Sequence, residues 1–123
     1  IYVGISQKLP MNKDYDMWLE IEKLANTLNA TIEDFYKAGI ELANSEANYQ
    51  IKLRSQALIE RAQGVPVTMI STFIKGHAEV AELRQKRDIC ESRYKMLENK
   101  INSIKFQMRV LDAQASREWT KND

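Results

Sequence analysis

The chain has 123 residues, of which 44% are hydrophobic and 28% charged, with four glycines and two prolines. This composition is typical of an ordered single domain, and the scarcity of turn residues favours helix over sheet. There are 18 Lys and Arg residues against 17 Asp and Glu, so no overall charge attracts nucleic acid or anionic lipid. One cysteine excludes an internal disulfide and fits a reducing cytoplasm. No apolar run approaches the ~18 residues of a membrane span, so we expect a cytoplasmic protein without a membrane partner.

Residues 1–11 are extended in character and are predicted to form a leader, with Met11 a candidate for the original start. Residues 12–123 are predicted to form a single helical domain. Its first helix is expected over about 13–29, because Asn12 can act as a cap and apolar residues recur at helical spacing from Trp18 to Leu28. Thr31 suits the cap of a second helix over about 32–63, so residues 29–31 are a predicted helix-to-helix turn.

The second helix is predicted to pack through an apolar face that contains an eleven-residue repeat. The residues of this face are Tyr36, Ile40, Ala43, Ala47, Ile51, Leu58 and Ala62. Gly39 costs roughly 1 kcal/mol inside a helix, which indicates close approach by a neighbouring group. Gly64 and Pro66 form a stop signal after this helix.

The segment GVPVTMISTFIKG, residues 64–76, predicts a short helix over 66–75 that is apolar in nearly every direction. Its large apolar residues are Val67, Met69, Ile70, Phe73 and Ile74. Such a helix either tucks between the ends of its two long neighbours or docks into a partner protein. The first interpretation is preferred, and the second makes these five residues a candidate partner-binding site.

A long helix is expected over about 77–119, roughly 63 Å at 1.5 Å per residue. Its apolar residues alternate spacings of three and four without a slip, which is a heptad register. These positions are Val80, Leu83, Arg87, Cys90, Tyr94, Leu97, Ile101, Ile104, Met108, Leu111, Ala115 and Glu118. Arg87 and Glu118 are the charged exceptions among these positions, and we expect Arg87 to fix the register between helices.

A second apolar set lies on the opposite side of this helix, at Ile89, Met96, Phe106, Val110 and Ala113. If the first helix doubles back near the C-terminal end, it covers the last three of these and brings Trp18 near Trp119. Ile89 and Met96 then remain uncovered, which predicts a homo-oligomer with these residues in the subunit contact. The predicted fold is therefore all-α: a long antiparallel, coiled-coil-like hairpin with a shorter N-terminal helix, assembled into dimers or higher oligomers.

Residues suited to catalysis do not converge. His77 and Cys90 lie about 20 Å apart along one helix, so they cannot form a dyad within a protomer. No spacing of His, Cys or carboxylate residues indicates a metal site, and no phosphate-binding glycine loop is present. We therefore expect no enzyme, no metal and no cofactor.

Basic residues gather on the last helix, and a surface displaying them could follow a phosphate backbone. The candidate nucleic-acid contacts are Arg84, Arg93, Lys95, Lys100, Lys105 and Arg109. A solvated face neutralised by nearby glutamates explains the same pattern and is the preferred interpretation.

Residues 12–119 resemble a group of small helical proteins of phages and prophages of Gram-positive bacteria. The resemblance is carried by the GVPVT turn and by several short elements of the last helix. These are Val80, Arg87-Asp88, Tyr94-Lys95, Ile101-Asn102 and Arg117-Glu118-Trp119. It implies an accessory protein encoded near recombination and single-strand-binding genes. The chain departs from the pattern at His77, where a small acidic or polar residue is usual.

Three functional hypotheses follow. The first is a non-enzymatic phage accessory protein that binds a phage or host protein in DNA replication or recombination. The second is an inhibitor of a host defence or nuclease protein. The third is direct binding of nucleic acid. All three place the protein in the cytoplasm of the bacterial host.

Overall fold

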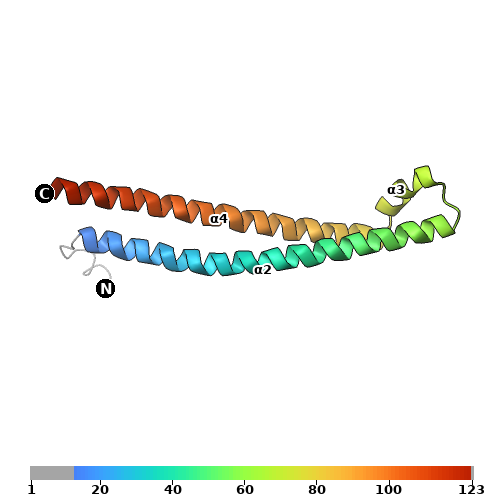
Figure 1. The fold of residues 1–123 in the computed structure, drawn as a ribbon, viewed down its shortest axis with the longest axis horizontal. Helices are drawn as coiled ribbons and strands as arrows, with labels where there is room; N and C mark the ends of the chain where they lie inside the picture. Colours follow the sequence, from blue (N-terminus) through green and yellow to red (C-terminus); the bar gives the residue numbers. More distant parts are fainter. Residues whose placement is uncertain (1–12, 123) are drawn as a thin grey trace, which may run out of the picture. The chain divides into compact units, whose positions relative to one another are not determined.

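The computed structural model describes residues 13–122, and every regular element within them is a helix (Figure 1). Helix α2 spans Lys13–Ala62, α3 spans Val67–Lys75 and α4 spans Ala78–Asn122. The predicted all-α class is confirmed for this part of the chain. The leader predicted for residues 1–11 and the cap predicted at Asn12 lie outside the described residues.

Helix α2 is continuous, so the predicted turn at residues 29–31 and the separate shorter N-terminal helix were wrong. Thr31 does not cap a helix. It is only 2% exposed, and its Oγ1 donates a hydrogen bond to the carbonyl oxygen of Thr27 at 2.7 Å, one turn earlier in the same helix. Residues 13–38 contain neither glycine nor proline, and nothing else in this stretch stops a helix.

The face of α2 that was predicted to pack is exposed. We call its residues Tyr36, Ile40, Ala43, Ala47, Ile51 and Leu58 the outer stripe. The buried and half-buried residues instead continue the spacing of four and three that begins in the first turns of the helix. They include Ile21, Leu24, Leu28, Thr31, Phe35, Ala38, Leu42, Ser45, Tyr49, Lys52 and Gln56.

Polar residues occupy several positions of this packed face and satisfy their hydrogen bonds within α2. The Oγ of Ser45, which is 4% exposed, donates to the carbonyl oxygen of Leu42 at 2.9 Å. The Nε2 of Gln56 donates to a carboxylate oxygen of Glu60 at 2.9 Å. A buried polar group with a partner costs little, so these residues are tolerated in the interface.

The turn between α2 and α3 follows the predicted stop signal. Gly64 has a φ of +87°, a left-handed conformation that glycine adopts without strain. Its N–H donates to the carbonyl oxygen of Arg61 at 3.1 Å, and the N–H of Val65 donates to that of Glu60 at 3.1 Å. These two bonds form a Schellman motif, which closes α2 before Pro66 precedes α3.

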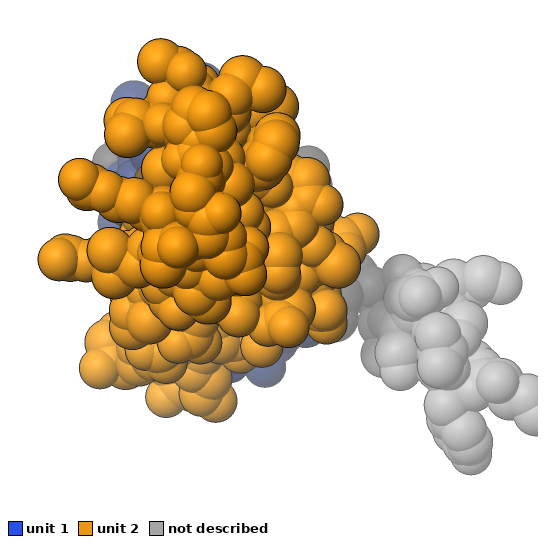
Figure 2. All heavy atoms as spheres, turned by 90° about the vertical axis from the view of Figure 1, so that its right-hand side faces the viewer, with its two compact units in different colours: residues 1–32, 99–123 blue, residues 33–98 orange. Residues whose placement is uncertain are grey.

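The described chain divides into two compact units, coloured separately in Figure 2. Of the described residues, 13–32 and 99–122 belong to unit 1, and 33–98 form unit 2. Within unit 2, α2 and α4 run in opposite directions, because the partner number on α4 falls as the number on α2 rises. The cross-helix ion pairs join Glu41 to Arg93, Glu46 to Arg87 and Lys52 to Glu79.

An aromatic contact in unit 2 explains the glycine inside α2. The rings of Phe35 and Tyr94 are stacked with their centroids 4.5 Å apart. A Cβ at Gly39 would lie 3.4 Å from Cε1 of Tyr94. The predicted close approach at Gly39 is therefore confirmed, and the approaching group is the Tyr94 ring.

The packed face of α4 agrees with the predicted register. All twelve of its predicted inner positions are buried or half-buried. Among the described residues, the fully buried hydrophobic side chains are nonetheless few: Ala38, Ile74, Val80 and Leu97 in unit 2, and Ile104 in unit 1. Two helices in contact along one face each leave most of their surface uncovered.

Candidate interaction surfaces

Helix α3 has one broad apolar face, part of it buried and part exposed. The prediction that it is apolar in nearly every direction was wrong, because its opposite face carries Thr68, Ser71, Thr72 and Lys75. Ile74 is 5% exposed and Ile70 is half-buried, and these two residues are one turn apart on the inner side. Val67, Met69 and Phe73 are exposed, and we call these three residues the outer side of α3. Met69 and Phe73 lie on the flank of the apolar face away from Ile74, whereas Val67, seven positions before Ile74, is exposed at the first turn of the helix. The two alternatives considered for this helix therefore apply to different parts of its apolar face. Its inner side packs within unit 2, and its outer side remains available for a partner.

Helix α4 exposes more apolar residues than its register predicted. Ile89 and Met96 are exposed as expected, although their role as subunit contacts stays a prediction. Phe106, Val110 and Ala113 were expected to lie under a doubled-back first helix, but they too are exposed. The reason is that no separate first helix exists, since residues 13–62 form the single helix α2.

Arg87 links the two long helices of unit 2. Its Nη1 donates to Oε2 of Glu46 on α2 at 2.8 Å, and its Nε donates to Oδ1 of Asp88 at 2.7 Å. The guanidinium carbon also lies 4.8 Å from the ring centroid of Tyr49. These contacts to α2 form only when the helices align in one register, which supports the role predicted for Arg87.

The charges of this cluster stabilise one another. The hydrogen bond from Arg87, and then that from Gln50, holds the pKa of Glu46 below its ordinary value. The hydrogen bonds to Asp88 and Glu46 raise the pKa of Arg87. A second ion pair of unit 2 has the same effect. The Nζ of Lys52 lies 2.7 Å from Oε2 of Glu79, and its hydrogen bond lowers the pKa of Glu79.

The six basic residues proposed as nucleic-acid contacts do not form one continuous free surface. Arg93 is paired with Glu41 at 2.7 Å, and Lys95 lies 3.6 Å from Glu91. Within residues 13–122, no ion pair is formed by Arg84, Lys100, Lys105 or Arg109. The first three of the six residues in sequence belong to unit 2 and the last three to unit 1.

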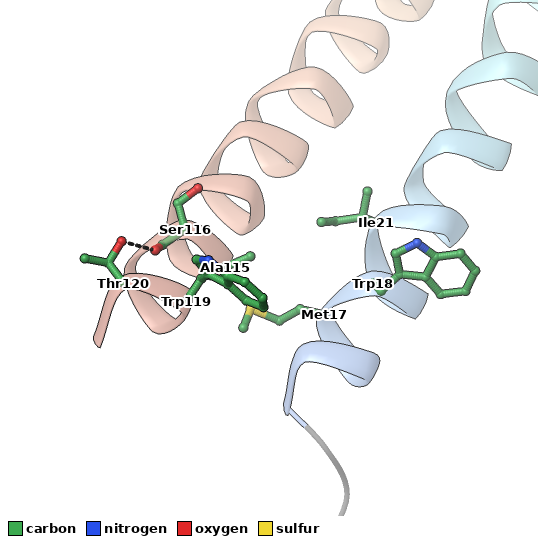
Figure 3. A pocket seen from close by; sticks show the side chains of 7 residues that line it. All are labelled: Met17, Trp18, Ile21, Ala115, Ser116, Trp119 and Thr120. Carbon is green, nitrogen blue, oxygen red and sulfur yellow. Dashed lines mark hydrogen bonds between the residues drawn. The ribbon is translucent and has the colours of Figure 1, made fainter. Parts of the chain in front are cut away.

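A surface pocket of about 450 Å³ lies between the start of α2 and the end of α4 in unit 1 (Figure 3). Its lining residues are Met17, Trp18, Ile21, Ala115, Ser116, Trp119 and Thr120. The expected proximity of the two tryptophans is confirmed, although Figure 3 shows the Trp18 ring directed away from Trp119. The side chains of the lining are apolar apart from two hydroxyl groups and two indole N–H groups, and none is an acid or a base, so the pocket is suited to apolar contact and not to proton transfer.

The two residues considered for catalysis, His77 and Cys90, lie at the start of α4 and on its packed face. The carbonyl oxygen of His77 accepts from the N–H of Ala81 at 2.9 Å in the first turn of α4. The imidazole Nδ1 of His77 is buried without a hydrogen-bond partner. Cys90 is a half-buried free thiol on the packed face of α4. In the part of the chain that the structure describes, no three His, Cys, Asp or Glu side chains are grouped to hold a metal ion.

Comparisons with protein-family models, with curated proteins and with solved structures found no match to this chain. None of the helices described for residues 13–122 contains a stretch both long enough and apolar enough to cross a bilayer.

Proposed function

We propose that this protein acts by binding other proteins, without catalysing a reaction. The observation that carries the proposal is the distribution of its large apolar side chains. Among the described residues, sixteen large hydrophobic side chains are exposed, whereas five hydrophobic residues are buried. Single exposed apolar residues are normal, but repeated ones along a helix face are typical of surfaces that another chain covers.

The outer side of α3 is the surface proposed for a partner protein. Val67, Met69 and Phe73 stand on a helix whose inner side is already packed through Ile74. The only charged residue of this helix is Lys75, so contact with an apolar groove would desolvate little charge. A short amphipathic helix that presents a few apolar anchors is a recurring mode of recognition.

The resemblance to phage proteins supports a partner in DNA replication or recombination of an infected bacterium. The alternative is a host defence or nuclease protein that the same surface inhibits. Both use the outer side of α3, and they differ in the identity and origin of the bound protein.

The test compares two phenylalanine variants in affinity capture from the infected host, followed by titration with the purified partner. Phe73→Asp places a charge on the outer side of α3, while Phe106→Asp is the matched control on α4, where the ring is even more exposed (60% against 47%). We expect Phe73→Asp to abolish binding and Phe106→Asp to preserve it, at both low and high salt. Equal binding by the two variants would remove α3 from the proposal.

Self-association is the second part of the proposal. Ile89, Met96 and the outer stripe of α2 expose large apolar residues at helical spacing in unit 2. A second copy of the chain is a partner that is always present, at the same concentration as the first copy. Light scattering is expected to give a molar mass of at least twice 14.3 kDa.

Direct nucleic-acid binding remains a candidate because Lys100, Lys105 and Arg109 of unit 1 are exposed and form no ion pair within the described residues. If nucleic acid is bound, affinity should fall steeply with salt, and Lys100→Glu with Lys105→Glu should reduce the salt dependence. Binding that is absent at low salt in the unmodified protein would exclude this candidate.

A further inference from the structure

We infer that the outer stripe of α2 is a symmetric dimer interface, in which the α2 helices of two copies pack antiparallel about a twofold axis at Ala47. This inference rests on the proposed self-association and names its face, its orientation and its contacts. The carrying observation is that the exposed residues of α2 between 33 and 61 are complementary to themselves when the helix is reversed.

The outer stripe has small residues at its middle and large residues at its ends. Ala43 and Ala47 lie between Tyr36 and Ile40 on one side and Ile51 and Leu58 on the other. Small residues at the centre allow two helices to approach closely, and large residues on either side then enclose the contact. The apolar residues of the outer stripe have the spacing of a helix interface. For this reason the sequence predicted that this face of α2 is packed.

An antiparallel pair centred on Ala47 places large side chains opposite small ones. Residues equally far before and after position 47 then face each other, so Ile51 of one copy faces Ala43 of the other. Tyr36 faces Leu58 at both ends of the contact. Ile40 faces Arg54, whose methylene groups can cover it while the guanidinium reaches water.

Charge distinguishes this arrangement from a parallel one. In the antiparallel pair, Glu33 of each copy faces Arg61 of the other, and both residues are exposed without an ion pair inside the described chain. In a parallel pair in register, Glu33 would face Glu33 and Arg61 would face Arg61. The antiparallel orientation therefore exchanges two like-charge contacts for two opposite-charge contacts.

The available apolar area is close to what a specific interface requires. Tyr36, Ile40, Ile51 and Leu58 are 70%, 45%, 68% and 59% exposed. At about 200 Å² for a large side chain, these fractions correspond to roughly 480 Å² per copy and about 960 Å² for two copies. A specific interface buries about 1,000 Å² or more, and the alanines and polar neighbours of the stripe add to this area.

Cysteine cross-linking tests the position of the axis and the orientation. In a Cys90→Ala background, Ala47→Cys brings two thiols together at the twofold axis, within the reach of a disulfide. Ala43→Cys is the matched control, because the two copies of residue 43 would lie about 12 Å apart along the helix axis. We expect oxidation to cross-link Ala47→Cys at least about tenfold more than Ala43→Cys, and an equal mixture of Ala43→Cys and Ile51→Cys to cross-link.

A charge exchange provides an independent readout. Glu33→Arg alone and Arg61→Glu alone are each expected to raise the dimer dissociation constant by about tenfold, and the double variant is expected to restore it. Circular dichroism of each variant establishes that the helices are intact.

The possible results separate this inference from the proposal on which it rests. Cross-linking of both Ala47→Cys and Ala43→Cys would indicate a parallel pair and would overturn it. A dimer by light scattering that is not cross-linked through Ala47→Cys would overturn the interface but leave self-association standing. A molar mass of 14.3 kDa at all concentrations would overturn both.

Discussion

Replacing Gly39 by alanine should stabilise the protein, although Gly39 lies against an aromatic ring. Alanine gains about 1 kcal/mol over glycine inside a helix. The added Cβ would meet Cε1 of Tyr94 at 3.4 Å and Cδ1 at 3.9 Å, which is the near edge of ordinary van der Waals contact. The ring therefore needs to shift by no more than a few tenths of an ångström, and we expect a net gain of about 0.5–1 kcal/mol.

The assay is thermal and urea unfolding followed by circular dichroism. A gain of this size should raise the melting temperature by about 2–6 °C. Gly39→Leu is the contrasting variant, because its larger side chain must displace Tyr94 from the stack with Phe35 and should be destabilising. In a Tyr94→Leu background, the preference of residue 39 for alanine is measured without the ring. A loss of more than 1 kcal/mol for Gly39→Ala with Tyr94 present would refute the argument from contact distance.

Other substitutions and pH test further parts of the structure. Asn29→Pro should destabilise the protein by about 3 kcal/mol in urea unfolding because α2 is continuous there, whereas a near-neutral effect would indicate the turn first predicted. Gly64→Ala should cost about 1–2 kcal/mol in the same assay, since its φ of +87° strains any residue with a Cβ. Glu46 and Glu79 have pKa values lowered below 4.5 in the folded state, so their stabilising effect is present above pH 4.5 and is lost as the pH falls through the lowered values. Acid unfolding should accordingly become shallower in Arg87→Met with Lys52→Met, and an unchanged acid profile would show that these ion pairs do not contribute.

The features that could be predicted from the sequence are those in which local signals agree with tertiary packing. On α4, ten of the twelve inner positions are apolar or aromatic or carry the cysteine, no competing pattern of equal length exists, and all twelve positions are the covered ones. Gly64 and Pro66 marked the turn because glycine and proline act through backbone geometry alone. Gly39 indicated a close neighbour, and Tyr94 is that neighbour.

The packed face of α2 could not be predicted in this way, because polarity and burial disagree along it. Ser45 and Gln56 are buried there with hydrogen bonds inside their own helix, while Tyr36 and Ile51 are exposed on the opposite side. Thr31 was predicted to cap a helix, because threonine is common at that position. Its hydroxyl instead donates a hydrogen bond to the carbonyl oxygen of Thr27 in the preceding turn. Continuing the spacing from Leu28 through Thr31 to Phe35 would have identified the correct face.

The candidate surfaces were predicted only in outline. The apolar character of α3 was evident, but which side packs depends on how α3 lies against the rest of unit 2, and the burial of Ile74 settles this. The exposure of Ile89 and Met96 was expected. The exposure of Phe106 was not predicted, because residues 13–29 were expected to form a separate helix that covers it. Nothing in the sequence of α4 itself indicated that Phe106 is covered.

The most direct test of the central claim of self-association, that a second copy of the chain covers exposed apolar residues of unit 2, is the dependence of unfolding on protein concentration. If two copies associate when folded and separate when unfolded, each tenfold increase in concentration should add about 1.4 kcal/mol to the apparent free energy of unfolding per dimer. Urea unfolding followed over a hundredfold range is therefore expected to show a midpoint that rises steadily. An identical midpoint at every concentration, with full helicity, would mean that the folded chain is complete alone and would contradict the claim.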